Sequence, residues 1–382
     1  MKKIRGLLAS AGGADFMSSL TAVVIGLFAG FLILAAVNPP QALGGLTAIL
    51  TGGFSGMRNI GQVLYFATPI IMTGLSVGFA GKTGLFNIGA SGQYTVGAFA
   101  AIYIGVRCDF LPPGLHCAAA LAGAAAAGAL WGAIPGVLKA WRNVNEVIAC
   151  IMTNYIGMYL VNHLITQTIL DSRYNQTMRV SNSANLPKLG LDKIFRSGGS
   201  VSSVNGGFLI AVASAVLLYF VLEKTKLGYE LKACGFNRDA ARYAGINEKR
   251  GIVLSMAVAG TLAGLGGALT YLAGSGSSMS VVDMLAAEGF TGIPVALLGF
   301  NSPIGIIFSG LLISYLTVGS FNMQLYNFSP QIIEIIIAII IYFSAFSLLL
   351  KGLLGRLLRR PTAGKRRLKE PPPEGSLGGD AP

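Results

Sequence analysis

Stretches without a charged residue recur along the whole chain and limit its fold more than any other feature. Five of them are long and unbroken, at 16–37, 59–81, 83–106, 205–222 and 251–282. About 20 apolar residues suffice for a helix to cross a bilayer, where each backbone group must be hydrogen-bonded within the protein. The pattern therefore predicts an all-α polytopic membrane protein.

The composition agrees with this class and excludes others. Only 11% of the residues are charged, whereas about 25% is usual in a soluble domain. A cytosolic enzyme, a disordered chain and a disulfide-rich secreted module are therefore excluded. The net charge is +13, and the basic residues lie between the apolar runs. Basic loops on an anionic membrane surface therefore explain this charge better than a nucleic-acid partner does.

Ten membrane spans account for the charge pattern. Besides the five clean intervals, 110–138 and 143–170 are nearly free of charge. The interval between Glu288 and Glu334 holds two spans, separated by Asn301-Ser302-Pro303, and the last span begins at Glu334. We divide the chain into a cytoplasmic N-terminus (1–15), a membrane domain (16–350) and a basic, then Pro- and Gly-rich cytoplasmic tail (351–382).

The basic residues indicate the orientation of these spans. Ten spans place 21 Lys and Arg on one side and seven on the other, and the richer side is expected to face the cytoplasm. Both termini are then cytoplasmic, the polar segment 171–206 is outside and the basic segment 223–250 is inside. No cleavage site follows the first span, so we expect it to be retained. Five spans on each side of the outer segment predict an inverted 5+5 repeat.

One segment imitates a nucleotide-binding loop. It ends in Gly81-Lys82-Thr83, but Ser76 stands where the motif needs its first glycine, and a membrane-length run precedes it instead of a short strand. We interpret it as a helix end whose lysine reaches the interface. No bound ATP, Mg²⁺ or other cofactor is expected in this chain.

Polar side chains at membrane depth are candidates for a transport path. Asn87 and Gln93 lie in a glycine-rich segment, and broken backbone at this depth is tolerated where it lines a cavity. Helix packing explains the glycines but not the two amides. Glu288 opens a short span, and a carboxylate within the membrane is a functional candidate. We predict that Asn87, Gln93, Asn154 and Glu288 face the path.

The other acids near the membrane have simpler interpretations. Glu146 follows Arg142 by four positions and is expected to pair with it, and Glu334 lies near the outer end of the last span. So few acids argue against an ion-coupled secondary transporter, which stays an alternative. An intramembrane enzyme would need a nucleophile with a base, or a metal cluster, and the sequence shows neither.

Histidine and cysteine spacing predicts no metal site. His116 and His163 are far apart, and the four cysteines form no CxxC pair. Cys108 and Cys117 both fall near the outer face, so a disulfide between them is conceivable in an oxidising compartment. The entry of Cys117 into a helix argues against the bond.

The inner segment 223–250 contains a short helix with clear limits. Asn237 can cap its start and Gly245 can end it. Its alanines at 240, 241 and 244 suit docking in a partner's groove, although a plain surface helix is the alternative. The residues that we expect to couple this chain to a partner are Gly235, Asn237, Ala240, Ala241, Tyr243 and Gly245.

Several motifs, in order along 64–310, resemble one known family. They are Ala67-Thr68-Pro69-Ile70, Gly84-Leu85-Phe86-Asn87-Ile88-Gly89-Ala90, Val144-Asn145-Glu146-Val147-Ile148, Asn154-Tyr155-Ile156, the inner-segment helix, Val295-Ala296-Leu297-Leu298-Gly299 and Pro303-Ile304-Gly305. The chain resembles bacterial ABC importer permeases of the branched-chain amino acid and simple-sugar class, most closely the nucleoside-type (BMP-system) permeases. Ser91, Pro294 and Phe300 depart from the nucleoside-type pattern.

The resemblance implies a type II ABC importer permease in the bacterial cytoplasmic membrane. Such a subunit is not an enzyme, because a separate ATPase, with two nucleotide domains in one chain, binds ATP and Mg²⁺ and docks on the inner-segment helix. A second homologous permease completes the pore, and an extracytoplasmic binding lipoprotein delivers the substrate. Nucleosides are the expected substrate, and a simple sugar such as ribose is the alternative.

Overall fold

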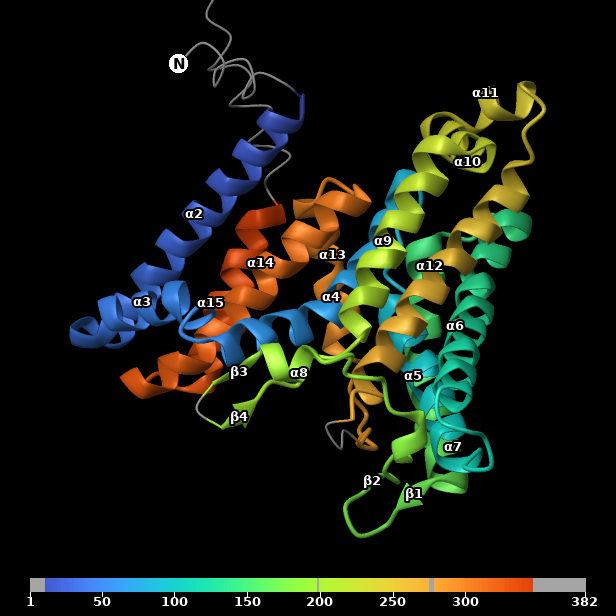
Figure 1. Cartoon of the computed structure of the whole chain (residues 1–382). Helices are drawn as coiled ribbons and strands as arrows, with labels where there is room; N and C mark the ends of the chain where they lie inside the picture. Colours follow the sequence, from blue (N-terminus) through green and yellow to red (C-terminus); the bar gives the residue numbers. More distant parts are fainter. Residues whose placement is uncertain (1–10, 198, 275–277, 346–382) are drawn as a thin grey trace, which may run out of the picture.

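The computed structural model describes residues 11–197, 199–274 and 278–345, and most of them are helical (Figure 1). The helices of the first half are α2 (Ala11–Val37), α3 (Ala42–Gly52), α4 (Met57–Lys82), α5 (Ala90–Arg107), α6 (Leu115–Arg142) and α7 (Glu146–Thr168). Those of the second half are α8 (Leu191–Ile194), α9 (Gly207–Lys224), α10 (Lys226–Phe236), α11 (Arg238–Tyr243), α12 (Glu248–Tyr271), α13 (Ala287–Leu298), α14 (Pro303–Phe321) and α15 (Pro330–Ala345). Three short 3-10 turns are η1 (Pro39–Gln41), η2 (Asn182–Ala184) and η3 (Asn322–Tyr326).

The long apolar helices confirm a polytopic membrane protein. Within the described residues, seven helices are long and apolar enough to cross a membrane: α2, α4, α6, α7, α9, α12 and α14. The ten spans that we predicted would need α5, α13 and α15 as well. The described part of α13 has 12 residues and that of α15 has 16, so the number ten and the inverted repeat stay predictions.

Polar segments gather at the two ends of the bundle. The start of α2 lies at the same end as α10 and α11, and the short strands lie at the other end (Figure 1). These strands form two hairpins, β1 (Leu170–Asp171) with β2 (Gln176–Thr177), and β3 (Arg196–Ser197) with β4 (Ser200–Val201). The arrangement agrees with the expectation that 171–206 and 223–250 lie on opposite sides of the membrane.

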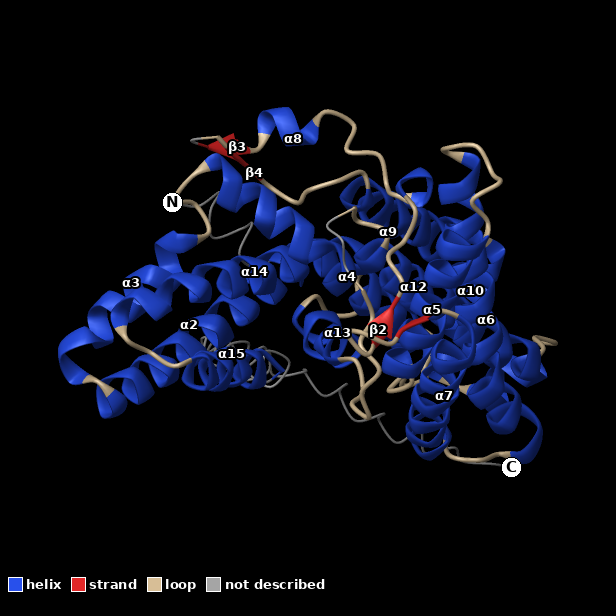
Figure 2. Cartoon of the chain, turned by 90° about the horizontal axis from the view of Figure 1, so that it is seen from below, coloured by secondary structure: helices blue, strands red, loops and turns tan. Residues whose placement is uncertain are grey.

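One helix was not expected from the sequence. The charge-free intervals at 16–37 and 59–81 placed no span between them, and α2 does end at Val37 before the two prolines, but α3 follows almost at once. Its buried face packs with α2, α14 and α15 in a separate apolar cluster around Leu34, Ile49 and Phe328. Figure 2 shows this group apart from α5, α6, α7 and α12, with α13 between the two. Both groups contact α4, whose central residues are almost all buried.

Glycines bring the helices of the second group into backbone contact. Gly260 and Gly264 of α12 face Gly128 of α6, and Gly97 of α5 also lies against Gly264. A methyl group added at Gly264 would lie 2.6 Å from the carbonyl oxygen of Ala124. Lipid tails are as apolar as leucine, so helices in a membrane associate through such close packing. These glycines are therefore packing residues.

The cysteines are free in the structure. Cys117 is buried at the start of α6, whereas Cys108 is half-buried beyond the end of α5, and no disulfide joins them. His116, next to Cys117, is fully buried and lies 2.8 Å from the Ser183 hydroxyl and 2.9 Å from the Ile104 carbonyl oxygen. This histidine fastens the outer segment to α5 and α6. Among the described residues, no group of three His, Cys, Asp or Glu is placed to hold a metal ion.

Replacement of Gly264 by valine should destabilise the helix bundle. The added side chain would collide with the α6 backbone, and overpacking of this kind costs about 1–3 kcal/mol. We expect a lower thermal unfolding midpoint in detergent. Gly251→Ala in the same helix is the matched control, because its methyl group would meet the nearest atoms at 3.6 and 3.8 Å, an ordinary contact. Equal midpoints for both variants would contradict this account of the packing.

Candidate functional site: a buried amide network and the segment that contacts it

Asn87, in the turn between α4 and α5, is hydrogen-bonded to Gln93 in the first turn of α5. The Asn87 amide nitrogen donates to Gln93 Oε1 at 2.8 Å, and Gln93 Nε2 donates to Asn87 Oδ1 at 3.1 Å. The Asn87 nitrogen also donates to the Ser76 hydroxyl at 3.0 Å. All three side chains are buried. A buried amide without a partner is costly, so this reciprocal pairing is what allows two amides at this depth.

Asn154 of α7 fixes the same turn from the other side. Its Nδ2 donates to the Ile88 carbonyl oxygen at 3.0 Å, and its Oδ1 accepts from the Gly92 backbone nitrogen at 2.8 Å. Gly92 must be glycine, because a methyl group there would lie 2.8 Å from the Asn154 Cα atom. Helix α5 has no side-chain cap, so the Asn154 carbonyl supplies the partner that a free amide at its first turn requires.

The structure thus joins three of the four predicted path residues in one network. Their polar groups are paired with each other and with backbone, and their side chains are buried. Their role in the path stays a prediction, whereas their role in fixing the α4–α5 turn is a matter of geometry. Ser76 also belongs to the network. In the sequence, Ser76 stood out only as the residue that replaces the first glycine of a nucleotide-binding loop motif.

Glu288 lies apart from this network, in the first turn of α13. Its side chain is half-buried, and in the described ranges no hydrogen bond or ion pair reaches its carboxylate. The tyrosines at 94 and 271 are near enough for its charge to act on their hydroxyls. Glu288 is therefore not part of the amide network.

The glycines of α13 allow this helix to pack closely against α4 and α5. Gly289 lies against the backbone of Ser91, and Gly292 against that of Thr73, where an added methyl group would be 2.5 Å from a carbonyl carbon. The Ser91 hydroxyl donates to the Ala286 carbonyl oxygen at 2.8 Å. Ser91 is the position at which the sequence departs from the nucleoside-type pattern. Here it anchors the start of α13.

One predicted ion pair is wrong. We expected Glu146 to pair with Arg142, but the Lys139 ammonium lies 2.9 Å from Glu146 Oε2. The chain turns at Asn143, which has a left-handed backbone, and Asn145 caps α7 through the Val147 nitrogen. The two residues are therefore on different helices, and the spacing rule for one continuous helix does not apply.

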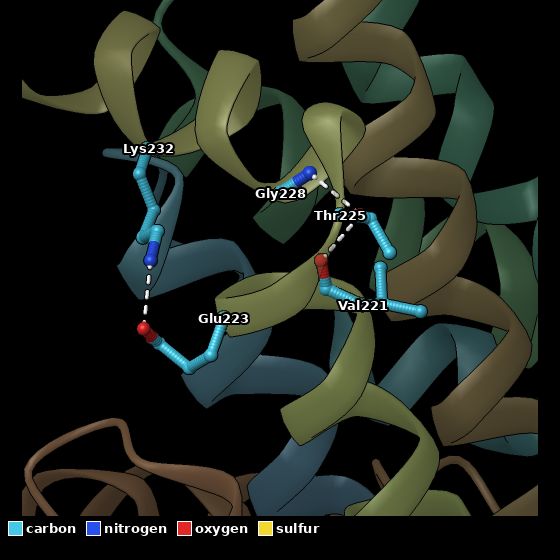
Figure 3. A network of polar contacts seen from close by, with 5 residues as sticks. All are labelled: Val221, Glu223, Thr225, Gly228 and Lys232. Atoms are coloured by element: carbon cyan, nitrogen blue, oxygen red, sulfur yellow. Dashed lines mark hydrogen bonds and ion pairs between the residues drawn. The ribbon is translucent and has the colours of Figure 1, made fainter.

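At the other end of the bundle, a bend held by polar contacts joins α9 to α10 (Figure 3). The Thr225 hydroxyl donates to the Val221 carbonyl oxygen at 2.6 Å and accepts from the Gly228 nitrogen at 3.2 Å, so it caps α10. The Lys232 ammonium donates to Glu223 across the bend at 3.0 Å. These contacts fix the direction in which α10 leaves the membrane-spanning helices.

The short helix α11 follows α10 and has the expected limits. The Asn237 side chain accepts from the Ala240 nitrogen at 3.0 Å, and Gly245 has a φ of 79°, the left-handed geometry of a helix end. The predicted docking face differs in one position: Ala240 and Ala244 are exposed, but Ala241 is buried, with 4% exposed surface. Tyr243 projects instead, with 94% of its surface exposed.

The exposed aromatic ring at Phe236 precedes α11, so two rings flank the helix. Phe236 has 90% of its surface exposed. The sequence analysis did not include Phe236 among the residues expected to couple this chain to a partner. Close by, burial raises the pKa of the Cys234 thiol above its ordinary value, as do the carboxylates of Glu248 and Glu230. This thiol is therefore neutral at physiological pH.

The end of α10 lies directly on the turn that carries the amide network. Gly235 and Gly84 are in backbone contact, since a methyl group on Gly84 would be 2.6 Å from the Gly235 Cα atom and one on Gly235 would be 2.7 Å from the Thr83 carbonyl carbon. Gly84 has a φ of 73° and is three residues before Asn87. The hydroxyls of Thr83 and Ser255 bond to each other and tie the turn to α12. Displacement of α10 would thus press on this turn.

Comparison with known proteins gives consistent matches over most of the chain. Residues 59–345 match the model of the family described as branched-chain amino acid transport system, permease component. The chain is 38% identical to the guanosine ABC transporter permease NupP of Bacillus subtilis, over 89% of this chain and 96% of NupP. It is 36% identical to the nucleoside ABC transporter permease NupB of Lactococcus lactis, over 88% of this chain and 92% of NupB.

A sugar permease is also similar. The glucose ABC transporter permease TsgB13 of Haloferax volcanii is 34% identical, over 87% of this chain and 86% of TsgB13. No solved structure matches.

Replacement of Asn87 by alanine should destabilise the permease. It leaves both polar ends of the buried Gln93 amide without a partner at Asn87, and an unpaired buried group costs about 1–3 kcal/mol. We expect the thermal unfolding midpoint of the purified protein to fall. The control is Gln167→Ala, which shortens an exposed amide in α7. Unchanged stability together with lost transport would show instead that Asn87 acts on the substrate directly.

Proposed function

Since the chain belongs to the family of branched-chain amino acid transport system permease components, we propose that it imports nucleosides as the membrane subunit of an ATP-driven ABC transporter. The choice of nucleosides as the substrate is supported by the similarity to NupP and NupB, at 38% and 36% identity over nearly the full length of each. The sugar permease TsgB13 follows at 34%. A simple sugar is therefore the second candidate.

We propose that a separate ATPase, with two nucleotide domains in one chain, docks on α11. The support is the projection of Phe236 and Tyr243 on either side of a helix whose limits are fixed by Asn237 and Gly245. Arg238 and Arg242 flank the same face. Aromatic and arginine side chains are the residues most often found as anchors of protein interfaces. This docking requires α11 to be cytoplasmic.

We also propose a second, homologous permease and an extracytoplasmic binding lipoprotein. Glu288 is half-buried in a single chain, and α13 lies between two groups of helices (Figure 2). A carboxylate at membrane depth should face a water-filled path and not lipid. A second subunit over this face would enclose the path, and the binding protein would deliver substrate at the outer end.

Transport by the reconstituted complex tests the substrate. With the ATPase, the second permease and the binding protein in proteoliposomes, we expect ATP-dependent uptake of labelled guanosine that persists when a protonophore removes the proton gradient. Labelled ribose and glucose are the parallel substrates. Uptake of a sugar without guanosine uptake would favour the second candidate, and collapse with the protonophore would contradict ATP-driven import.

The exposed ring of Tyr243 should be needed for ATPase binding. We expect Tyr243→Ser to leave the permease stable, because the side chain touches water only, and to reduce both the ATPase that co-purifies and ATP-driven uptake. Loss of an aromatic anchor at an interface costs about 2 kcal/mol or more, roughly thirtyfold in affinity. Tyr174→Ser, at an exposed tyrosine of the outer segment, is the matched control. Normal ATPase recovery with Tyr243→Ser would contradict docking at this position.

A further inference from the structure

The segment just before α13, residues 279–286, is attached to hairpin β1–β2; we call it the strap. The Thr177 nitrogen donates to the Met279 carbonyl oxygen at 2.9 Å, and the Val281 nitrogen donates to the Asn175 carbonyl oxygen at 3.0 Å. Side chains add to this pairing. The Met279 nitrogen donates to the Thr177 hydroxyl, and the Asn175 amide donates to the Val281 carbonyl oxygen, both at 3.1 Å. The strap is therefore a third strand of the hairpin.

Two long helices also hold the strap before it enters α13. The Asn162 amide of α7 donates to the Val282 carbonyl oxygen and to Asp283 Oδ1, both at 3.0 Å. Further along, the Ala286 carbonyl oxygen accepts from the Ser91 hydroxyl of α5 at 2.8 Å. The strap thus joins the hairpin, α7 and α5 at the end of the bundle where the strands lie (Figure 1).

Exposed polar contacts hold the strap, whereas close packing holds the helix that follows it. Of the strap residues only Met279 is buried, and Met284 has 75% of its surface exposed. The hydrogen bonds from Asn162 and Asn175 are exposed, and water can replace either partner of such a bond. The glycines of α13 are instead in contact with backbone of α4 and α5. Segments with exposed hydrogen bonds and few buried contacts open first, so the strap is the weaker attachment.

The strap limits how far the start of α13 can move. Asp283, which is bonded to α7, is four residues before the first residue of this helix. Glu288, which we expect to face the transport path, is the second residue of the helix. A chain of four residues has a short reach, so a large shift of this end of α13 has to pull the strap away from the hairpin and α7.

We propose that the strap restrains α13 and must detach from hairpin β1–β2 in every transport cycle. The inference rests on the proposed import function, because a permease that alternates between two states has to move the helices that line its path. Asn162 and Asn175 are positioning residues that hold the strap in its attached state.

A disulfide between strap and hairpin tests this proposal. Gln176 of β2 and Ser280 face each other in an antiparallel bridge, as a non-hydrogen-bonded pair. The Cα atoms of such a pair are about 4.5 Å apart, which a disulfide can span. The variant Gln176→Cys with Ser280→Cys is measured in the full complex in proteoliposomes, with the labelled substrate that the wild type takes up. We expect oxidation to lower ATP-driven uptake about tenfold or more, and reduction to restore it, because a fixed strap stops the cycle.

The matched control is Arg196→Cys with Val201→Cys, which places the same bond across hairpin β3–β4. These residues are partners in that hairpin, and beside them the Ser202 nitrogen donates to the Phe195 carbonyl oxygen at 3.1 Å, so the pair is of the same kind. This hairpin leads into α9 and not into α13. We expect equal uptake in its oxidised and reduced forms. The single-cysteine variants control for the native thiols.

Thiol labelling follows the strap without a crosslink. Because Met279 has 7% of its surface exposed, the thiol of Met279→Cys should react with a maleimide only while the strap is detached. We expect labelling to be about threefold faster or more while ATP and the loaded binding protein keep the complex turning over. Asn175→Ala, which removes one bond to the strap, should speed the reaction in the resting complex as well. The reaction is measured from the mass of the labelled peptide.

The proposal would be overturned by equal uptake of the oxidised and reduced double variant, or by a loss that reduction does not reverse. Failure of the disulfide to form would contradict the pairing itself. If the double variant does not assemble with the ATPase, labelling decides, and a rate that turnover leaves unchanged would exclude detachment. Absence of ATP-driven uptake by the wild-type complex would instead contradict the proposed function.

Discussion

Close approach of backbones at glycine is the contact on which this structure depends. In lipid, apolar side chains gain nothing by leaving a lipid tail for a neighbouring helix, so association relies on tight packing and on hydrogen bonds between helices. Gly128, Gly260 and Gly264 bring α6 and α12 together, and Gly289 and Gly292 seat α13 on α5 and α4. These glycines are therefore part of the packing.

Tight packing leaves little room for water, and this decides how polar groups can be placed. Asn87 and Gln93 are tolerated because each satisfies the other, with Ser76 taking the remaining donor. Asn154 satisfies backbone groups at 88 and 92 in the same way. Glu288 has no such partner within the described residues, which separates it from the amides by chemistry as well as by position. A paired amide stabilises a turn, whereas an unpaired carboxylate is available to a ligand.

The sequence predicted those features that depend on local chemistry. The membrane helices and the short helix α11 with its cap and stop follow from patterns within one segment, and the structure confirms them. The sequence could not reveal contacts between distant segments. The partner of Glu146 depends on the turn at Asn143, the burial of Ala241 depends on the neighbouring helices, and α3 owes its place to packing on α14 and α15 rather than to a charge pattern.

The same reasoning explains why the α4–α5 turn is so strongly constrained. On one side, Gly84 lies against Gly235 at the end of α10, and on the other side Asn154 of α7 holds Ile88 and Gly92. Between them lie Asn87 in the turn and Gln93 in α5. Ser91 of the same helix supports the start of α13 and thus the position of Glu288. Each contact is short and leaves no space to absorb a shift, because packed interfaces respond as units and do not deform continuously. The α4–α5 turn and the first residues of α5 therefore connect the end of α10 to the start of α13.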